Sequence, residues 1–508
     1  MSSIFSTFKV GALTLISRIL GLLRDIATTN LLGASVFHDV FVVVLKIPNM
    51  FRRLFAEGAF TLAFIPIYKS LISNKKDSEA NEFSDSLLTF MLIALSVFTL
   101  LALAIAPIFI FIFAPGYYFD SEIKMLAVDI LRIMFPYLSL MSLVAFAAGI
   151  QNSHNYFSIP AATPIVFNCV LIAAAIFFSE FFEIPVFALA WGVLISGFLQ
   201  LLLQIYPLNR IGFRPKFSLS LKNKHLKKFG MAIIPAILAG GVAQINLVVD
   251  TVFASFLEEG SPTWLYVSER VMQLPIGVAA VAIGTVLLPS LSHHISSKNI
   301  DQFKQTFLKS TKLVIFIGLP CTLGLISLGY EILDMLFHRG AFLVKDVFKA
   351  NQSLQLFAIG VPFFMLMKVL VPCFFALKRE RIPLYIAIVG LVSNVILNYF
   401  FAFYLEFGHS GLALGSSIAA VIGVTIFFTI LIKEKYFSLN TSFFIFSLRV
   451  CFSALLMTIC IILLRNYFDL GSLSGLSNIL MVLLVIFIAF LTFLASSFIT
   501  GVRQKDFY

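Results

Sequence analysis

Residues 475–500, with the sequence GLSNILMVLLVIFIAFLTFLASSFIT, contain no charged side chain. A membrane-spanning helix needs about 20 predominantly apolar residues, so this stretch is long enough to cross a bilayer. The rest of the chain has a similar character: of its 508 residues 60% are hydrophobic and only 12% are charged, and the mean hydropathy is +1.01. Soluble domains contain about 45 to 50% apolar residues. The composition excludes soluble, disordered and disulfide-rich secreted proteins and predicts an all-α polytopic membrane protein.

Apolar runs separated by polar punctuation predict fourteen transmembrane helices along the chain. The chain start lacks a charged segment followed by a small-residue cleavage site, so we expect the first helix to be retained. The expected ranges are 6–32, 36–68, 86–113, 123–150, 159–179, 184–206, 229–256, 263–291, 313–337, 347–376, 383–405, 411–432, 444–464 and 475–500.

The charges between the predicted helices indicate their orientation. With the N-terminus inside, the inner loops carry 22 Lys and Arg residues and the outer loops carry 5. Positively charged loops remain in the cytoplasm, so this distribution predicts that both termini are cytoplasmic. This topology also explains the net charge of +11, and no basic segment interleaved with aromatic residues indicates nucleic-acid binding.

An internal repeat relates spans one to six to spans seven to twelve. Gly33 precedes Pro48 by 15 residues, and Gly260 precedes Pro275 by 15 residues. Because each half has an even number of spans, the two copies share one topology and form a parallel repeat, an architecture found in transporters. We therefore expect two six-helix lobes plus two C-terminal helices. The expected domains are an N-lobe at 1–206, a cytoplasmic amphipathic linker at 207–228, a C-lobe at 229–432, and the last two helices with a cytoplasmic C-terminus at 433–508.

Ionisable side chains inside the predicted spans are the strongest functional signal, because each costs about 2.5 to 3.5 kcal/mol near the centre of a membrane helix. We expect them to face protein or a water-filled cavity rather than lipid. Asp25 lies near Thr28 and Thr29, which allows local capping, and Arg53 and Glu57 stand four residues apart, which allows an ion pair along one helix. The other residues of this kind are Arg18, Arg24, Asp39, Lys46, Arg52, Asp250, Glu269, Arg270 and Lys368.

Four arginines have no acid three or four positions away that accounts for their charge: Arg18, Arg24, Arg52 and Arg270. The planar guanidinium group keeps its charge at any pH and binds a phosphate with two parallel hydrogen bonds. We therefore expect a cationic cavity whose missing counter-charge is an anionic substrate that carries a phosphate or diphosphate.

The stretches SRILGLLRD (residues 17–25) and KIPNMFRRLFAEGAF (residues 46–60), with Asp39 between them, closely resemble the MurJ (MviN) family of lipid II flippases. This family belongs to the multidrug/oligosaccharidyl-lipid/polysaccharide exporter superfamily. The resemblance implies a flippase rather than an enzyme, one that moves the undecaprenyl-diphosphate-linked peptidoglycan precursor from the inner to the outer leaflet of the bacterial cytoplasmic membrane. Three further stretches support it: Ser268-Glu269-Arg270, QLPIG at residues 273–277 and GTVLLP at residues 284–289.

The resemblance also implies roles for individual residues. The four arginines would line a central cavity and engage the diphosphate and headgroup of lipid II. The helices at 444–464 and 475–500 would form a lipid-facing groove for the undecaprenyl tail. The protein would act as a monomer among membrane lipids, with the cell-wall synthesis and division machinery as partners. The residues that would flank the cavity and tune binding or gating are Ser17, Asp39, Arg53, Glu57 and Glu269.

Two departures from the family pattern concern the second half. Relatives often have an acid where this chain has Gln273, and Asp is common where this chain has Glu269, so a gating ion pair at position 273 is in doubt. Some relatives bind sodium in the second lobe. Here Asp250, Asn394 and Asn398 carry the oxygen ligands for such a site, and the alternative for them is ordinary hydrogen bonding between helices.

Alternating access is the expected mechanism, with glycines and prolines of spans one, two, seven and eight as bending points. No cofactor is expected; sodium or the membrane potential would drive the cycle, because the chain has no GxxxxGK[ST] loop for ATP. Three alternatives remain open. One is an exporter of another polyprenyl-linked saccharide, and the second is an ion-coupled drug antiporter, which would favour lone cavity acids over arginines. The third is a membrane glycosyltransferase, which would need an acid pair with a His or DxD partner beside Glu258 and Glu259.

Overall fold

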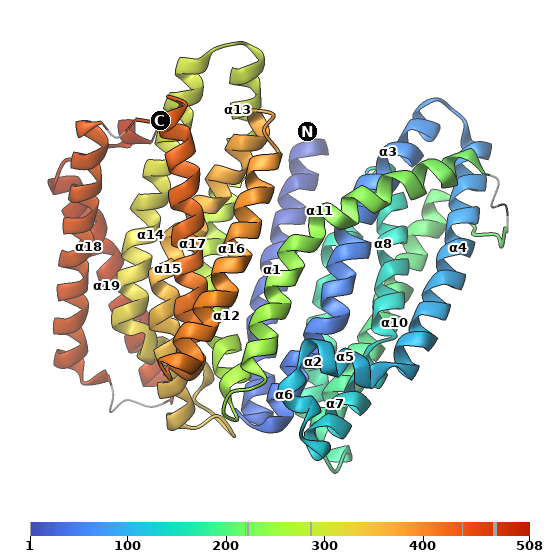
Figure 1. Cartoon of the computed structure of the whole chain (residues 1–508), viewed down its shortest axis with the longest axis horizontal. Coiled ribbons are helices and arrows are strands. Elements are labelled where there is room, and N and C mark those ends of the chain that lie inside the picture. The colour runs from blue at the N-terminus through green and yellow to red at the C-terminus, as the bar shows by residue number, and fades with distance from the viewer. Residues whose placement is uncertain are drawn as a thin grey trace. The chain divides into compact units, whose positions relative to one another are not determined.

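The computed structural model describes residues 2–218, 220, 223–284, 287–438, 440–470 and 475–507, without the side chains of residues 2–8, 55–57, 238–240, 242–243 and 278–284. These residues form helices joined by short turns, and an isolated bridge between Arg339 and Phe342 is the extended pairing found among them. The chain divides into two compact units, Met1–Pro262 and Thr263–Tyr508. Each unit is described by itself below (Figure 1).

The first unit contains eleven α-helices, counted over the described residues, and three short segments of other helical type. Two of these segments are π-helices, η1 and η2, and one is a 3₁₀-helix, η3. In chain order the elements are α1 (Ser2–Leu32), α2 (Val36–Arg52), η1 (Arg53–Ala59), α3 (Phe60–Ser73), α4 (Asp77–Ala104), α5 (Ala106–Phe113), α6 (Pro115–Tyr118), α7 (Ser121–Met134), α8 (Tyr137–Ser153), α9 (Ser158–Ala173), η2 (Ala174–Phe178), η3 (Ser179–Phe181), α10 (Val186–Ile211) and α11 (Lys224–Ala254).

The second unit has the same character. Its elements within the described ranges are α12 (Ser261–Gly284), α13 (Leu287–Ser296), α14 (Ile300–Phe337), α15 (Val344–Ala376), α16 (Arg381–Tyr399), the π-helix η4 (Phe400–Tyr404), α17 (Gly408–Lys433), α18 (Thr441–Phe468), α19 (Gly475–Ile499) and the 3₁₀-helix η6 (Gln504–Asp506).

By length and composition, ten helical segments in the described part of the chain are able to cross a membrane. Each of them overlaps one of the expected spans. The expected spans that contain no such segment are 6–32, 36–68, 229–256 and 263–291, which are helical over most of their described residues. Apart from Lys368, the intramembrane charges singled out from the sequence lie in these four ranges. The all-helical membrane fold is therefore confirmed, whereas the count of fourteen crossings and the parallel repeat remain predictions.

Prolines set several of the helix boundaries. The helix at 86–113, expected to be continuous, breaks at Ile105 because Pro107 near the start of α5 has no N–H for the preceding turn. The helix expected at 123–150 divides at Phe135 and Pro136. The proline at the matching position of the predicted repeat, Pro362, lies inside the continuous helix α15. A proline at matching positions therefore interrupts the helix in one half and is accommodated in the other.

The segment between α10 and α11, expected as an amphipathic linker on the membrane surface, contacts the helix α4. The backbone N–H of Lys216 donates to Asp85 Oδ1 at 2.9 Å, and that of Ser218 donates to Thr89 Oγ1 at 2.9 Å. Beyond this segment, the Phe229 ring of α11 packs 5.6 Å from the Phe60 ring, centre to centre. The helix α11, expected in the C-lobe, therefore belongs to the compact unit Met1–Pro262 because its start is held in that unit's core.

The last two long helices pack against each other and against α14 at the edge of the second unit (Figure 1). Their shared core contains Val450, Ile461 and Val485, which are 1% exposed or less. Polar contacts hold the same three helices together. Arg465 Nε of α18 lies 2.6 Å from the buried Glu331 Oε1 of α14, and Asn478 Nδ2 of α19 donates to Asp334 Oδ2 at 2.8 Å.

Candidate functional site

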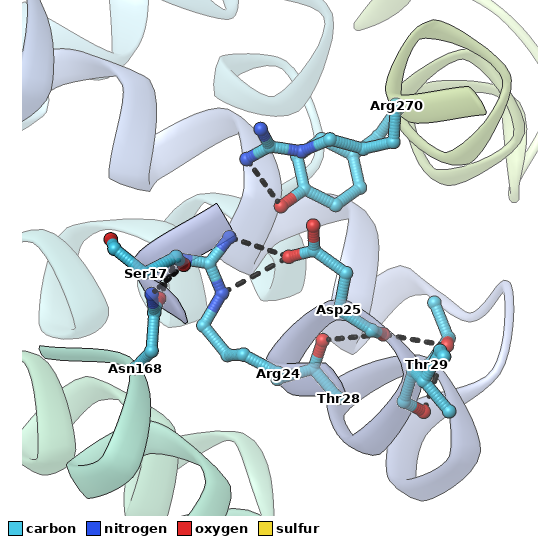
Figure 2. Close-up of polar contacts among 9 residues, drawn as sticks. Ser17, Arg24, Asp25, Thr28, Thr29, Asn168 and Arg270 are labelled. Atoms are coloured by element: carbon cyan, nitrogen blue, oxygen red, sulfur yellow. Dashed lines mark hydrogen bonds and ion pairs between the residues drawn. The ribbon is translucent and has the colours of Figure 1, made fainter. Parts of the chain in front are cut away.

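Arg24 of α1 lies at the centre of a polar cluster inside the first unit (Figure 2). Its Nε and Nη2 donate to Asp25 Oδ1 at 3.0 and 2.5 Å, and its Nη1 donates to Asn168 Oδ1 of α9 at 3.1 Å. The guanidinium carbon lies 5.4 Å from the centre of the Phe167 ring. The two side chains of the ion pair are 11% and 3% exposed. The charge of Arg24 is thus held in a fixed plane between two helices.

The acid partner of Arg24 corrects one expectation from the sequence. The helical spacing favours an acidic partner three or four positions from Arg24, whereas its partner Asp25 is the adjacent residue. Adjacent side chains on a helix diverge by about 100°, but the long arginine side chain bridges this angle. Arg24 therefore has a counter-charge within the protein before any substrate binds.

The two threonines beyond Asp25 do not bond to its carboxylate. Thr28 Oγ1 and Thr29 Oγ1 donate to the backbone carbonyl of Asp25 at 3.1 and 2.7 Å (Figure 2). Such hydrogen bonds from a hydroxyl to a preceding carbonyl satisfy the threonines within their own helix. The Asp25 carboxylate is left to face Arg24.

Asn168 joins α1 to α9 through both ends of its amide group. Its Oδ1 accepts from Arg24, and its Nδ2 donates to the backbone carbonyl of Ser17 at 3.0 Å. The side chain is 5% exposed. Sequence reasoning named Ser17 and Arg24 but missed Asn168, although a single amide in the apolar span 159–179 was a signal that could have found it.

The other arginines of the first unit that the sequence analysis singled out lie in different surroundings. Arg18 is exposed, one and two-thirds turns before Arg24 on α1. Arg52, half-buried at the end of α2, donates from Nε to Asn49 Oδ1 at 3.2 Å. Arg53 is exposed and opens the π-helix η1. The side chain of Glu57 lies outside the described residues, so the expected Arg53–Glu57 pair is not tested.

Asp39 has a clear structural contact. It is 3% exposed, and its Oδ2 accepts from the backbone N–H of Gly260 at 2.6 Å. Nearby, Glu259 Oε1 accepts from the backbone N–H of Val36 at 3.0 Å. Gly260 has φ of 93°, a conformation that favours glycine. These contacts tie the start of α2 to the turn after α11.

The second unit contains Arg270, Glu269 and Gln273 on α12. Arg270 Nη2 donates to Tyr266 Oη at 3.0 Å, and its guanidinium carbon lies 4.9 Å from the centre of the Tyr266 ring. Gln273 Nε2 donates to Glu269 Oε1 at 2.7 Å. The amide at position 273 thus makes a hydrogen bond that an ionised acid there does not make. Of the four predicted arginines, three lie in the first unit and Arg270 lies in the second.

The expected sodium ligands are divided between the two units. Asn394 and Asn398 are buried one turn apart on α16. Asn398 Nδ2 donates to Asn394 Oδ1 at 3.1 Å, and Asn394 Nδ2 donates to Ser416 Oγ at 3.0 Å. Asp250 belongs to α11 of the first unit. Asn394 makes one interhelical hydrogen bond of the kind named as the alternative, to Ser416 of α17, whereas the bond between the two asparagines lies within α16. Sodium binding by the three residues stays a prediction.

Comparison with known proteins identifies the family. The family model "Lipid II flippase MurJ" matches residues 28–483. A probable lipid II flippase MurJ from Buchnera aphidicola subsp. Schizaphis graminum is 35% identical over 471 residues, which cover 92% of this chain and 90% of the relative. A solved structure of lipid II flippase MurJ in an inward closed conformation matches with a TM-score of 0.81 and 28% identity, over 96% of this chain and 98% of that one.

A more distant structure shows how widely the fold is shared. An inward-facing multidrug resistance MATE family transporter of the MOP superfamily matches with a TM-score of 0.68, over 84% of this chain and 97% of that one. Its identity is only 15%, so this match concerns the fold alone. The family model and the relatives that are about one third identical distinguish the MurJ family from the MATE family. This chain belongs to the lipid II flippase MurJ family.

Proposed function

We propose that this chain flips lipid II from the inner to the outer leaflet of the bacterial cytoplasmic membrane by alternating access. The observation that carries the proposal is the family match over residues 28–483. The buried Arg24 cluster supports it, because a guanidinium held in place inside an apolar helix bundle is suited to a diphosphate. The activity is transport, with no chemical change to the substrate.

Arg24 would bind the diphosphate by exchange with Asp25. The edge of the guanidinium formed by Nε and Nη2 faces one carboxylate oxygen, and this edge also suits a phosphate oxygen. Asn168 holds the remaining Nη1 and keeps the plane of the group fixed during the exchange. In the empty protein Asp25 thus neutralises a charge that would otherwise be expensive in the membrane.

The other predicted residues extend this site in the proposal. Arg18 and Arg52 of the first unit and Arg270 of the second engage further parts of the diphosphate and headgroup. Five residues flank the pathway and tune binding or gating: Ser17, Asp39, Arg53, Glu57 and Glu269. The π-helix η1 supports a gating role for its region, because π-helical turns inside α-helices often mark functional sites.

The remaining features of the proposal concern the whole protein. It crosses the membrane fourteen times, has both termini in the cytoplasm and works as a monomer. The undecaprenyl tail lies along α18 and α19, whose outward apolar side chains include Leu463 and Phe487, 65% and 57% exposed. Sodium at Asp250, Asn394 and Asn398, or the membrane potential, resets the carrier. The cell-wall synthesis and division machinery supplies its partners.

The test is replacement of the resident flippase in a bacterium depleted of its own. The gene is expected to restore growth and the exposure of lipid II at the outer leaflet. Arg18→Ala, Arg24→Ala, Arg52→Ala and Arg270→Ala are each expected to lose this rescue at matched membrane levels. Lys75→Ala, in the exposed turn between α3 and α4, is the control that removes a cation elsewhere and keeps the activity.

The alternatives give different results in this test. An exporter of another polyprenyl-linked saccharide would insert normally but leave lipid II unexposed. A drug antiporter would confer resistance without restoring growth. Normal rescue by all four alanine variants would contradict the arginine mechanism while leaving the family assignment intact.

A further inference from the structure

The segment that joins α10 to α11 is held against one face of α4. Besides the backbone contacts to Asp85 and Thr89, Asn223 Nδ2 donates to Glu82 Oε1 at 3.3 Å. Glu79 accepts from His225 at 3.1 Å and pairs with Lys224 at 3.3 Å. The four acceptors on α4 follow one another at three-, three- and four-residue steps, so they line a single side of the helix.

This attachment holds the backbone on both sides of Phe217. Lys216 and Ser218 both direct their N–H groups to α4, so the chain is extended between them. Phe217, the residue between these two contacts, is 70% exposed.

Exposed cations flank Phe217 in the sequence. None of them makes an ion pair within the described part of the chain, in contrast to Lys224, which pairs with Glu79. Clusters of four to eight Lys and Arg beside a membrane helix attract anionic lipids. The exposed cations are Arg210, Arg214, Lys216, Lys227 and Lys228.

The depth of Phe217 along α4 matches a membrane interface. At 1.5 Å per residue, Thr89 lies about 10 Å further along the helix than Glu82. The exposed surface of α4 is charged around Glu79 and becomes apolar from Phe90 and Ile93, which are 49% and 45% exposed. Ser218 contacts α4 at Thr89, directly before this change. Phe217 therefore lies where the α4 surface changes from polar to apolar.

We propose that the first part of the α10–α11 connector, residues 212–218, is an anchor for anionic phospholipid on the inner leaflet, with Phe217 inserted beside the acyl chains and Arg214 and Lys216 bound to the headgroup phosphates. The proposal rests on the cytoplasmic placement of residues 207–228 in the proposed function. It adds a lipid site separate from the Arg24 cluster. Docking on α4 holds the backbone that carries these exposed side chains.

The test uses the full chain in phospholipid vesicles and the variant Phe217→Trp. The chain has two other tryptophans, Trp191 and Trp264, whose signal in the unmodified chain is subtracted. Brominated phosphatidylglycerol or brominated phosphatidylcholine is added to equal mole fractions as a fluorescence quencher. We expect the mole fraction that half-quenches the introduced tryptophan to be about 30-fold lower for the anionic lipid, the factor that two basic residues contribute near an anionic surface.

Variants without the two cations distinguish specific binding of anionic lipid from contact with any lipid. Arg214→Gln with Lys216→Gln, in the Phe217→Trp background, is expected to make the two quenchers equal. Lys298→Gln with Lys304→Gln removes the same charge from the turn and start of α14 and is expected to preserve the difference between the two lipids. Molar salt is also expected to abolish the difference by screening.

Three results would overturn the proposal. Absence of quenching by either lipid would place the introduced tryptophan in water and leave a soluble partner as the occupant. Equal quenching by both lipids would remove the anionic preference, and a difference that survives neutralisation would remove the role of Arg214 and Lys216. Loss of lipid II rescue with the lipid preference intact would instead reject the proposed function and keep the anchor.

Discussion

At the scale of single residues, the sequence identified Arg24 but not the way its charge is compensated. A guanidinium inside a predicted span was recognisable because lipid does not solvate it. Its partners Asp25 and Asn168 became clear only from the geometry, since one is adjacent in the chain and the other lies on α9. Distances in sequence are a poor guide to contacts of a side chain as long as arginine.

Arg24→Lys is expected to abolish the rescue of a flippase-depleted cell. Lysine keeps the positive charge but presents a compact ammonium group, which does not hold Asp25 and Asn168 in one plane. A lost charge-assisted hydrogen bond weakens binding by about 1.5 to 3 kcal/mol, or roughly ten- to 150-fold. Outer-leaflet lipid II exposure measures the effect, with Lys75→Arg as the control, and undiminished exposure would show that charge alone suffices.

Asn168→Asp and Asn168→Leu separate the two functions of the amide. The acid still accepts from Arg24 but no longer donates to the Ser17 carbonyl, whereas leucine does neither. We expect Asn168→Leu to reduce lipid II exposure more than Asn168→Asp. Equal activity of the leucine variant and the unmodified chain would contradict a positioning role for Asn168.

At the scale of elements, prolines and buried polar contacts decide where helices end and which of them pack together. Pro107 and Pro136 divide two expected spans, and Pro362 does not. The pair α18–α19 is joined to α14 by apolar packing and by Arg465 with Glu331. Sequence patterns predict a helix well, because apolar length is local, but they do not predict these contacts between helices.

Arg465→Ala is expected to lower the thermal midpoint of the protein in detergent. The change leaves the Glu331 carboxylate, 3% exposed, without the cation at 2.6 Å. Losing one partner of a fully buried pair costs about 3 to 5 kcal/mol, and Arg465 is half exposed, so we expect about 1 to 2 kcal/mol. The double variant Glu331→Leu with Arg465→Leu should regain most of the midpoint; failure to regain it would mean that the contact does not stabilise the helix pair through charge.

The turn between α8 and α9 is expected to make stability depend on pH. Burial lowers the pKa of His154 from its ordinary 6.5, although Asp77 opposes this effect. A histidine with a lowered pKa contributes stability above pH 6.5, and this contribution is lost as pH falls below 6.5 because folding then opposes protonation. The thermal midpoint should therefore fall more steeply below pH 6.5 in the unmodified chain than in His154→Gln. Parallel curves would assign the pH dependence to other groups.

At the scale of the whole molecule, the helical membrane fold was visible in the sequence, whereas the lobes predicted from the repeat stay a prediction and differ from the units that contacts define. The expected N-lobe ended at residue 206, whereas the first compact unit continues to Pro262 and includes α11. Packing of Phe229 against Phe60 and the contact of Ser255 Oγ with the Gly116 N–H at 3.1 Å hold that helix in the first unit. A compact unit is defined by contacts between residues of different helices, and a repeat in the sequence does not predict these contacts.

Orientation in the membrane is testable with single cysteines. In a chain freed of its five cysteines, Arg210→Cys should react with a membrane-impermeant thiol reagent only after the cell is opened. Phe119→Cys, in the exposed turn after α6, should react in intact cells. The reason is the excess of Lys and Arg in the loops assigned to the cytoplasm. The reverse pattern of labelling would invert the topology.

The sequence by itself determined the class of fold, most of the apolar helices long enough to cross a membrane, and the presence of Arg24 inside one of the predicted spans. These features depend on local apolar length and on the free energy of placing a charge in hydrocarbon, both of which are properties of a short stretch of chain. Tertiary structure alone decided that Asp25 and Asn168 hold Arg24, that Asp39 holds the turn at Gly260, and that the connector after α10 lies on α4. Those contacts join residues far apart in the chain or depend on side-chain direction, and only packing of the helices brings them within hydrogen-bonding distance.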